Sequence, residues 1–347
     1  MILKNGSVIQ GKVSERSEEG LLYLDLLDGR IAVPWSEVDR VVVGPEENWI
    51  DRPPPAIRAS SALLLEEGSG RIMLEKNPKE RRQIASLTKL MTAVMAQERG
   101  CLRDMVTVSR RAALTSGASL RLKAGQRVRM RDLLLGMLMK SANDAAVAVA
   151  EHIGGSEEEF VRLMNEKARS LGLLDTHFRN CHGLDEPDHY SSAYDMAELS
   201  RYAISFPFLA DCVRKREIVV SLGGNRRPKI WRNSNKLLRI YLGADGIKTG
   251  YTEEAGKCLV ASAQRGGLRL IAVLLNDEER WNDACELLEY GFSVLGREKA
   301  QALISPERPK ADEEEFSGLN TTLEGLLSAT GTPDVIPLSG SREDINS

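Results

Sequence analysis

The sequence predicts an α/β protein in which one mixed sheet is flanked by helices and carries an inserted all-helical subdomain. Strand signals occur near the start and the end of the long central part of the chain, and helical periodicity fills the stretch between them. Because strands at both ends bracket the helices, a single sheet with inserted helices is the simplest arrangement. A short all-β pattern precedes this part, so we also expect a small N-terminal unit.

That N-terminal unit is expected over residues 1–46. Asn5-Gly6 and Asp28-Gly29 stand between apolar runs, as in two-residue hairpin turns. We find no residues in this unit that indicate chemistry, and we interpret it as an all-β appendage.

A linker is expected over residues 47–55. It ends in three consecutive prolines, which lack amide donors and favour a stiff, extended chain. The main domain then covers residues 56–298. It opens with a hairpin, since Ser61–Leu65 and Arg71–Leu74 flank a Gly-rich turn.

The helical part begins near Ala85, where apolar residues recur at helical spacing until Gly100 ends the helix. Later helical segments are expected over Leu133–Met139, Ala145–Ile153, and from a capping box at Ser156 and Glu159 to Leu171.

Strand signals return late in the domain. A short strand is predicted at Gly246–Thr252, followed by a hairpin of Cys258–Ala263 and Leu268–Leu275 and a last helix from Asn282 to Leu295. Residues 299–347 are rich in Ser, Glu, Pro, Gly and Thr, so we expect them to be mostly disordered.

Composition excludes several classes of function. The net charge of -3 does not suggest a nucleic-acid partner. The five cysteines form no C-x-x-C pair and are expected to be free thiols, and the histidines show no metal-ligand spacing, so neither a metal nor another cofactor is expected. No signal peptide is visible at the N-terminus, and Leu133–Met139 is too short to span a bilayer.

Three short motifs occur in a fixed order. They are Ser86-Leu-Thr-Lys89, Ser141-Ala-Asn143 and Lys248-Thr249-Gly250. Each motif is weak alone: about one Ser-x-x-Lys and one Ser-x-Asn are expected by chance in a chain of this length, and Lys-Thr-Gly is rarer. Their order and their placement on the predicted elements raise the specificity.

Ser86 and Lys89 are three residues apart at the start of a helix, so their side chains share a face. A serine hydroxyl needs a base to become a good nucleophile, and Lys89 can serve if burial and a second cation such as Lys248 lower its pKa. The amide of Ser86 can then help to stabilise an oxyanion. The alternative is that Ser86 caps the helix and Lys89 is solvated.

The other two motifs fit a cleft beside this pair. Ser141 and Asn143 lie between two helical segments, where they could point into a cleft or simply cap the following helix. Lys248 and Thr249 lie on a predicted strand whose edge could bind an extended peptide, and Gly250 would let the substrate approach. The alternative is an edge strand with a solubilising lysine.

At this point the sequence resembles the low-molecular-mass penicillin-binding D-alanyl-D-alanine carboxypeptidases, over about residues 55–298. The resemblance extends to longer matches than the three motifs. These are Ile84–Ala93, Lys140–Ala146, Asn180–Asp185, Ser192–Ala197, Asn233–Leu238, Asp245–Thr252 and Arg280–Phe292. It implies a DD-peptidase/β-lactamase-like fold with an antiparallel sheet.

The resemblance also implies roles for single residues. Ser86 would be the acylated nucleophile, Lys89 the general base, and Ser141 a proton relay to the leaving amine. The substrate would be bound by Asn143, Lys248, Thr249, Gly250, the amide of Tyr251, and Arg280. The substrate would be the stem peptide of peptidoglycan, and β-lactams would be covalent inhibitors.

Some features depart from the family. Tyr251 stands where histidine is frequent, and Cys181 replaces the usual proline, which puts a thiol near the expected cleft. Peptidoglycan implies an extracytoplasmic location, for which no export signal is visible in this chain. Two other functions stay open: a serine β-lactamase, and a non-catalytic sensor that binds peptidoglycan or penicillin.

Overall fold

The computed structural model describes residues 2–3, 12–13, 21–26, 29–40, 53–100, 102–220 and 229–304. In the N-terminal segment all of the described regular structure is strand apart from one 3-10 turn, Trp35–Glu37. The strands are β1 Ile2–Leu3, β2 Lys12–Val13, β3 Leu21–Leu26, β4 Gly29–Pro34 and β5 Val38–Arg40. β3 and β4 pair antiparallel, which confirms a hairpin here, but Gly29 belongs to β4 and pairs with Leu26, while Asn5-Gly6 lies outside the described residues.

A five-stranded antiparallel sheet forms the centre of the main domain, in the order β12-β13-β14-β6-β7. The strands are β6 Ser61–Glu66, β7 Ile72–Lys76, β12 Ala244–Thr252, β13 Gly256–Arg265 and β14 Leu268–Leu275. The two predicted hairpins are confirmed, but the expected mixed sheet is wrong, because every pairing is antiparallel. The family resemblance had implied an antiparallel sheet. Local patterns do not show in which direction β6 pairs with the distant β14.

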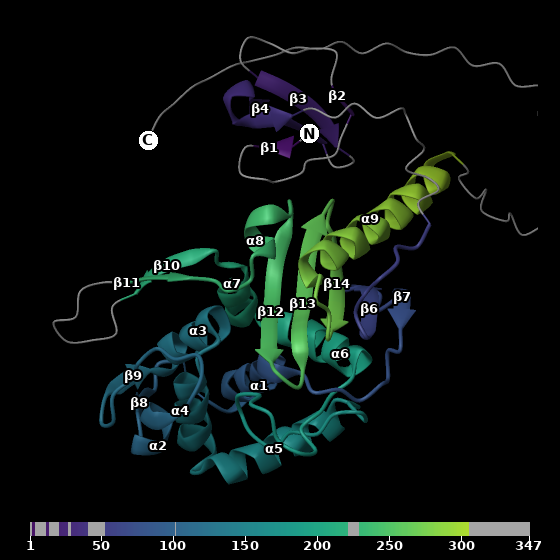
Figure 1. Ribbon diagram of the computed structural model, residues 1–347. Helices are drawn as coiled ribbons and strands as arrows, with labels where there is room; N and C mark the ends of the chain where they lie inside the picture. The colour runs from purple at the N-terminus through teal and green to yellow at the C-terminus, as the bar shows by residue number, and fades with distance from the viewer. Residues whose placement is uncertain are drawn as a thin grey trace, which may run out of the picture. The chain divides into compact units, whose positions relative to one another are not determined.

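Both faces of the sheet are covered, which explains its continuous apolar strands. Ala62 and Leu64 of β6 point to a core shared with the last helix, and Leu63 and Leu65 point to a larger core on the other face. Figure 1 shows α9 (Arg280–Ile304) lying along one face of the sheet, with α1 and α6 on the other. Alternate side chains of β6 point to opposite faces of the sheet, so this one strand contributes to the core on both faces.

The segment between β7 and β12 is mostly helical. Its elements are η3 Ala85–Thr88, α1 Lys89–Arg99, α2 Arg110–Leu114, α3 Met130–Lys140, α4 Asn143–Gly154, α5 Glu157–Ser170, α6 Ala193–Ile204, α7 Pro207–Arg214 and α8 Leu237–Ile240. It also contains two antiparallel pairs, β8 Met105–Thr107 with β9 Arg127–Arg129 and β10 Glu217–Val220 with β11 Lys229–Arg232. The expected all-helical insert is therefore wrong in this detail, because strands of three or four residues are too short to show a clear period.

Helix boundaries follow the predicted signals. The Ser156 side chain accepts a hydrogen bond from the Glu159 amide at 3.1 Å, and Gly155 ends α4 with φ of +77°. The helix predicted from Ala85 begins with a 3-10 turn and becomes α-helical at Lys89. α9 extends to Ile304, beyond the predicted end at Leu295. Of the helices in the described ranges, none is both long and apolar enough to cross a bilayer.

Candidate active site

The turn that carries Ser86 is set at the junction of the sheet and α1. Ala85 has φ of +47°, a left-handed conformation that is unusual for a residue with a side chain. Thr88 Oγ1 donates a hydrogen bond to the Ala85 carbonyl at 2.8 Å and stabilises this turn. Neither η3 nor α1 has a side-chain cap, so Ser86 is not a helix cap as in the alternative interpretation.

Lys89 lies fully buried directly below Ser86. Its Nζ donates to Ser86 Oγ at 2.8 Å and to the His182 carbonyl at 2.5 Å. Burial lowers the pKa of Lys89 to about 7, because desolvation disfavours the ammonium form. A large fraction of Lys89 is therefore a neutral amine near pH 7, within reach of the serine proton.

A second hydroxyl–amine pair lies beside the first. Ser141 ends α3 with φ of +60°, and its Oγ accepts a hydrogen bond from Lys248 Nζ at 2.9 Å. Lys248 is 1% exposed, and its pKa lies well below the usual value because of burial and the nearby charge of Lys89. The structure thus brings four predicted residues together as two hydrogen-bonded pairs.

Asn143 begins α4 at the wall of this site but does not cap it with its side chain. Its Nδ2 donates to the Ser116 carbonyl at 2.7 Å, and its backbone amide donates to the Ala118 carbonyl. Asn143 is expected to bind the substrate backbone. Part of its hydrogen-bonding capacity instead holds the neighbouring segment 116–118.

Asp144 is a structural residue that the sequence analysis missed. The carboxylate is fully buried and accepts hydrogen bonds from the Ser119 hydroxyl and from the amides of Leu120 and Leu122. It therefore attaches the segment that follows Ala118 to α4. The only available signal was its position directly after the Ser-Ala-Asn motif.

Thr249 follows Lys248 on the edge strand β12. It is hydrogen-bonded to Ser234, a second residue whose role was not predicted from the sequence. Its Oγ1 lies 2.9 Å from Ser234 Oγ. Asn233 and Asn235, on either side, bond through their side chains to the carbonyls of Val213, Lys215 and Gly246. The Asn-Ser-Asn match was noted in the sequence, but no role for Ser234 followed from it.

Gly250 allows the backbone of β12 to pass close to the turn that carries Ser86. A Cβ at this position would lie 2.9 Å from the Ile84 carbonyl oxygen and 3.2 Å from the Ser86 amide nitrogen. The backbone that a Cβ at Gly250 would meet is that of the serine turn, and the expected approach of the substrate stays a prediction. β12 and the amide of Ser86 are held together by this contact.

Gly250→Ala is expected to slow acylation of Ser86 by about 10- to 100-fold, because the added methyl group displaces the serine turn. The measurement is the rate of labelling by a fluorescent penicillin. Gly68→Ala is the matched control, since a Cβ there would meet only the flexible side chain of Glu66. Equal labelling rates in the Gly250 variant and the parent would contradict this prediction.

Tyr251 and Arg280 lie at the same end of β12. Tyr251 is 61% exposed, so its side chain is not buried in the site. Arg280 Nη1 donates to the carbonyls of Gly250 (2.7 Å) and Cys258 (3.0 Å), and its guanidinium lies 4.9 Å from the Trp281 ring centroid. Arg280 thus supports β12 and β13 through backbone contacts next to Gly250.

Cys181 is fully buried between α1 and α5, so its thiol does not face a cleft. Burial and the carboxylate of Glu157 raise its pKa well above the usual value. The neighbouring His182 contributes its carbonyl to Lys89, and this contact could not be predicted from the motif pattern.

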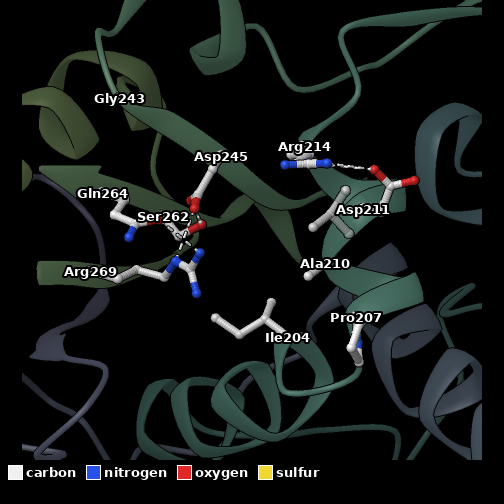
Figure 2. Close-up of a pocket in the computed structure, with 11 residues that line it drawn as sticks. Ile204, Pro207, Ala210, Asp211, Arg214, Gly243, Asp245, Ser262, Gln264 and Arg269 are labelled. Carbon is white, nitrogen blue, oxygen red and sulfur yellow. Dashed lines mark hydrogen bonds and ion pairs between the residues drawn. The ribbon is translucent and has the colours of Figure 1, made fainter. Parts of the chain in front are cut away.

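A separate pocket of about 460 Å³ lies at the start of β12, away from the two hydroxyl–amine pairs. Figure 2 shows Asp245 facing Ser262 and Arg269 across its sheet wall. Ser262 Oγ donates to Asp245 at 2.6 Å, and Arg269 Nε donates at 2.9 Å. None of the predicted site residues lines this pocket, and its contacts connect β12 to β13 and β14.

Comparison with known proteins identifies similar chains. A family model described as D-alanyl-D-alanine carboxypeptidase matches residues 49–279. The D-alanyl-D-alanine carboxypeptidase DacF of Bacillus subtilis is 38% identical over 279 residues, which cover 77% of this chain and 71% of that protein. DacC of Escherichia coli is also 38% identical, over 74% of this chain and 65% of its own length.

Solved structures give the same result. The carboxypeptidase DacD of Francisella tularensis has a TM-score of 0.66 at 32% identity and covers 72% of this chain and 74% of its own. The DD-transpeptidase of Streptomyces K15 has a TM-score of 0.66 at 31% identity, with 70% of this chain and 100% of that one covered. The fold class implied by the resemblance is confirmed, and the chain spans only about two thirds of the length of several curated relatives.

Proposed function

This chain belongs to the D-alanyl-D-alanine carboxypeptidase family of serine peptidases, and from this premise we propose that it removes the terminal D-alanine of peptidoglycan stem peptides. The observation that carries the proposal is the pairing of two hydroxyls with two buried amines, Ser86 with Lys89 and Ser141 with Lys248. Such pairs allow proton transfer without an imidazole or a metal ligand.

In the proposed acylation step, neutral Lys89 takes the proton of Ser86, and Oγ attacks the carbonyl carbon of the penultimate D-alanine. The oxyanion lies between the amides of Ser86 and Tyr251, which the close contact at Gly250 keeps near each other. Ser141, bonded to Lys248, relays to the departing amine the proton that Lys89 took from Ser86, so Lys89 becomes neutral again. The C–N bond breaks, D-alanine leaves, and an ester links the remaining peptide to Ser86.

In the proposed deacylation step, water attacks the ester carbonyl and gives a proton to Lys89, which is neutral again after acylation. The bond between the carbonyl carbon and Ser86 Oγ then breaks, Ser86 takes the proton back from Lys89, and the shortened peptide leaves. The substrate lies along the free edge of β12 as an additional strand. Its terminal carboxylate is bound by the polar end of that strand, with Lys248 and Thr249 in contact. Ser234 holds the Thr249 side chain, and Arg280 holds the backbone of the next residue, Gly250. Asn143 bonds the peptide backbone from the opposite wall.

The test uses the purified full chain and a synthetic stem peptide that ends in D-Ala-D-Ala. We expect free D-alanine to be released, and no release from the same peptide ending in L-alanine. A protein that binds the peptide without releasing D-alanine would be a sensor, and the proposal would be wrong.

A β-lactam separates the carboxypeptidase from a β-lactamase. We expect a stable mass increase of the protein equal to that of the intact penicillin. Rapid turnover of the penicillin with no lasting adduct would favour the β-lactamase. We further propose that the protein acts in the cell envelope, since peptidoglycan is located there.

A further inference from the structure

A buried carboxylate behind the site has no role in the proposed mechanism. Glu157 is the first residue of α5, a helix that supplies none of the proposed catalytic groups. It is only 5% exposed, although glutamate is rarely buried without a specific partner. Its two neighbours in sequence order, Glu158 and Glu159, point to solvent.

On its outer side Glu157 is paired with Arg111 of α2. Glu157 Oε2 accepts a hydrogen bond from Arg111 Nη2 at 2.7 Å, and the other arm of the guanidinium bonds Glu158 at the same distance. Arg111 and Glu157 both line a pocket of about 580 Å³, so water reaches the arginine side of the pair. The other carboxylate oxygen of Glu157, Oε1, is its inner oxygen and faces the protein interior.

That inner oxygen accepts two hydrogen bonds from the loop that precedes Gly183 and lies near a third group. Glu157 Oε1 lies 3.2 Å from both the amide nitrogen and the sulfur of Cys181. His182 Nε2 lies 3.6 Å away. The amide of Leu184 donates to Nδ1 of His182, so the neutral ring carries its proton on Nε2, directed at Glu157.

His182 is held in this neutral form. Burial, followed by the charge of Lys89, lowers the pKa of His182 to about 3. The ring therefore stays neutral over the range in which an enzyme of this kind would act, and it does not form an ion pair with Glu157.

The backbone of the same loop contacts the proposed base. The His182 carbonyl accepts a hydrogen bond from Lys89, and the Cys181 carbonyl accepts one from Thr92 Oγ1 at 2.6 Å. Asn180 Oδ1 closes the turn by accepting from the amides of His182 and Gly183. The position of the carbonyl that meets Lys89 thus depends on contacts from α1 on one side and from α5 on the other.

We propose that Glu157, held by Arg111, is a positioning residue that fixes the His182 carbonyl against Lys89 and so determines where the base lies relative to Ser86. This inference rests on the proposed function, because it assigns Glu157 a part in the acylation of Ser86. Glu157 does not touch the reacting atoms and acts only through the loop.

The sign of the electrostatic effect follows from the same contacts. The His182 carbonyl accepts a hydrogen bond from Lys89 and so stabilises its ammonium form. Removing Glu157 frees the loop and weakens this bond, so Lys89 loses its proton at lower pH. The other ionisable groups that face Lys89 are Lys248 on β12 and Cys181, His182 and His189 between α5 and α6. Among these, Cys181 loses its contact with Glu157 in the variant but stays a neutral thiol, because burial is the largest cause of its raised pKa.

The test measures the acylation rate of the full chain by fluorescent penicillin between pH 5 and 9. For Glu157→Ala we expect the maximal rate constant to fall about 10- to 100-fold, with little change in the penicillin concentration giving half the maximal rate. We also expect the acid limb of the pH profile to move to lower pH. Glu157→Gln should recover most of the rate, because its amide oxygen still accepts from Cys181.

Glu158→Ala is the matched control, since Glu158 shares Arg111 but its side chain is 69% exposed, and its rate should equal that of the parent. Arg111→Met, at a half-exposed position, gives a second folded variant, with an expected fall of about 3- to 10-fold. A Glu157→Ala profile with an unshifted acid limb would mean only a loss of folded protein and would overturn the inference. Absence of Ser86-dependent acylation in the parent would overturn the proposed function itself.

Discussion

Ser86→Ala is expected to abolish covalent labelling by penicillin and to lower D-alanine release by about 10⁴-fold or more. No other hydroxyl contacts Lys89 within the part of the chain that the structure describes, so the amine has no second nucleophile to activate. Mass spectrometry of the intact protein after incubation with penicillin measures the first effect. An assay for free D-alanine measures the second.

The Ser86 variant should stay folded. It loses one half-buried hydroxyl and its bond to Lys89, a change of about 1 kcal/mol in the free energy of unfolding. Ser170→Ala is the matched control, because this hydroxyl bonds only the Lys167 carbonyl at an exposed position. Labelling that persists in Ser86→Ala would place the nucleophile at another residue and refute the mechanism.

Lys89→Met is expected to slow acylation by about 10²- to 10⁴-fold, the usual contribution of a general base. Methionine keeps the length of the side chain but cannot accept the proton of Ser86. The parent should acylate faster as pH rises through about 7, because Lys89 there becomes a neutral amine. This rise should disappear in the variant. Stopped-flow labelling at a series of pH values measures both effects.

The free energy of unfolding distinguishes a variant that has lost the general base from one that has lost its folded structure. The pKa of Lys89 is depressed in the folded protein, so the unfolded chain binds more protons between about pH 7 and the ordinary lysine value. The parent therefore gains stability as pH rises through this window, and Lys89→Met should be at least as stable as the parent near pH 7. Lys123→Met, at an exposed position, is the control. A Lys89 variant that labels at the parental rate would remove this residue from the mechanism.

Much of the fold could be predicted because its signals are local. The hairpins around Gly68 and Gly266, and the cap at Ser156, depend on residues a few positions apart, and the structure has all of them. The direction of the β6–β14 pairing and the short strands β8 to β11 could not be predicted, because they depend on contacts between distant segments or on too few residues.

The sequence by itself determined the residue types of the site and their order: a serine with a lysine three positions later, a second serine, and a lysine on a late strand. Only the tertiary structure decided which of them meet, since Ser141 and Lys248 are 107 residues apart and bond at 2.9 Å. It also revealed Ser234, Asp144 and Glu157, whose partners are not their neighbours in sequence. The physical reason is that desolvation and hydrogen bonding act through space, so the state of Lys89 depends on what the whole fold packs around it.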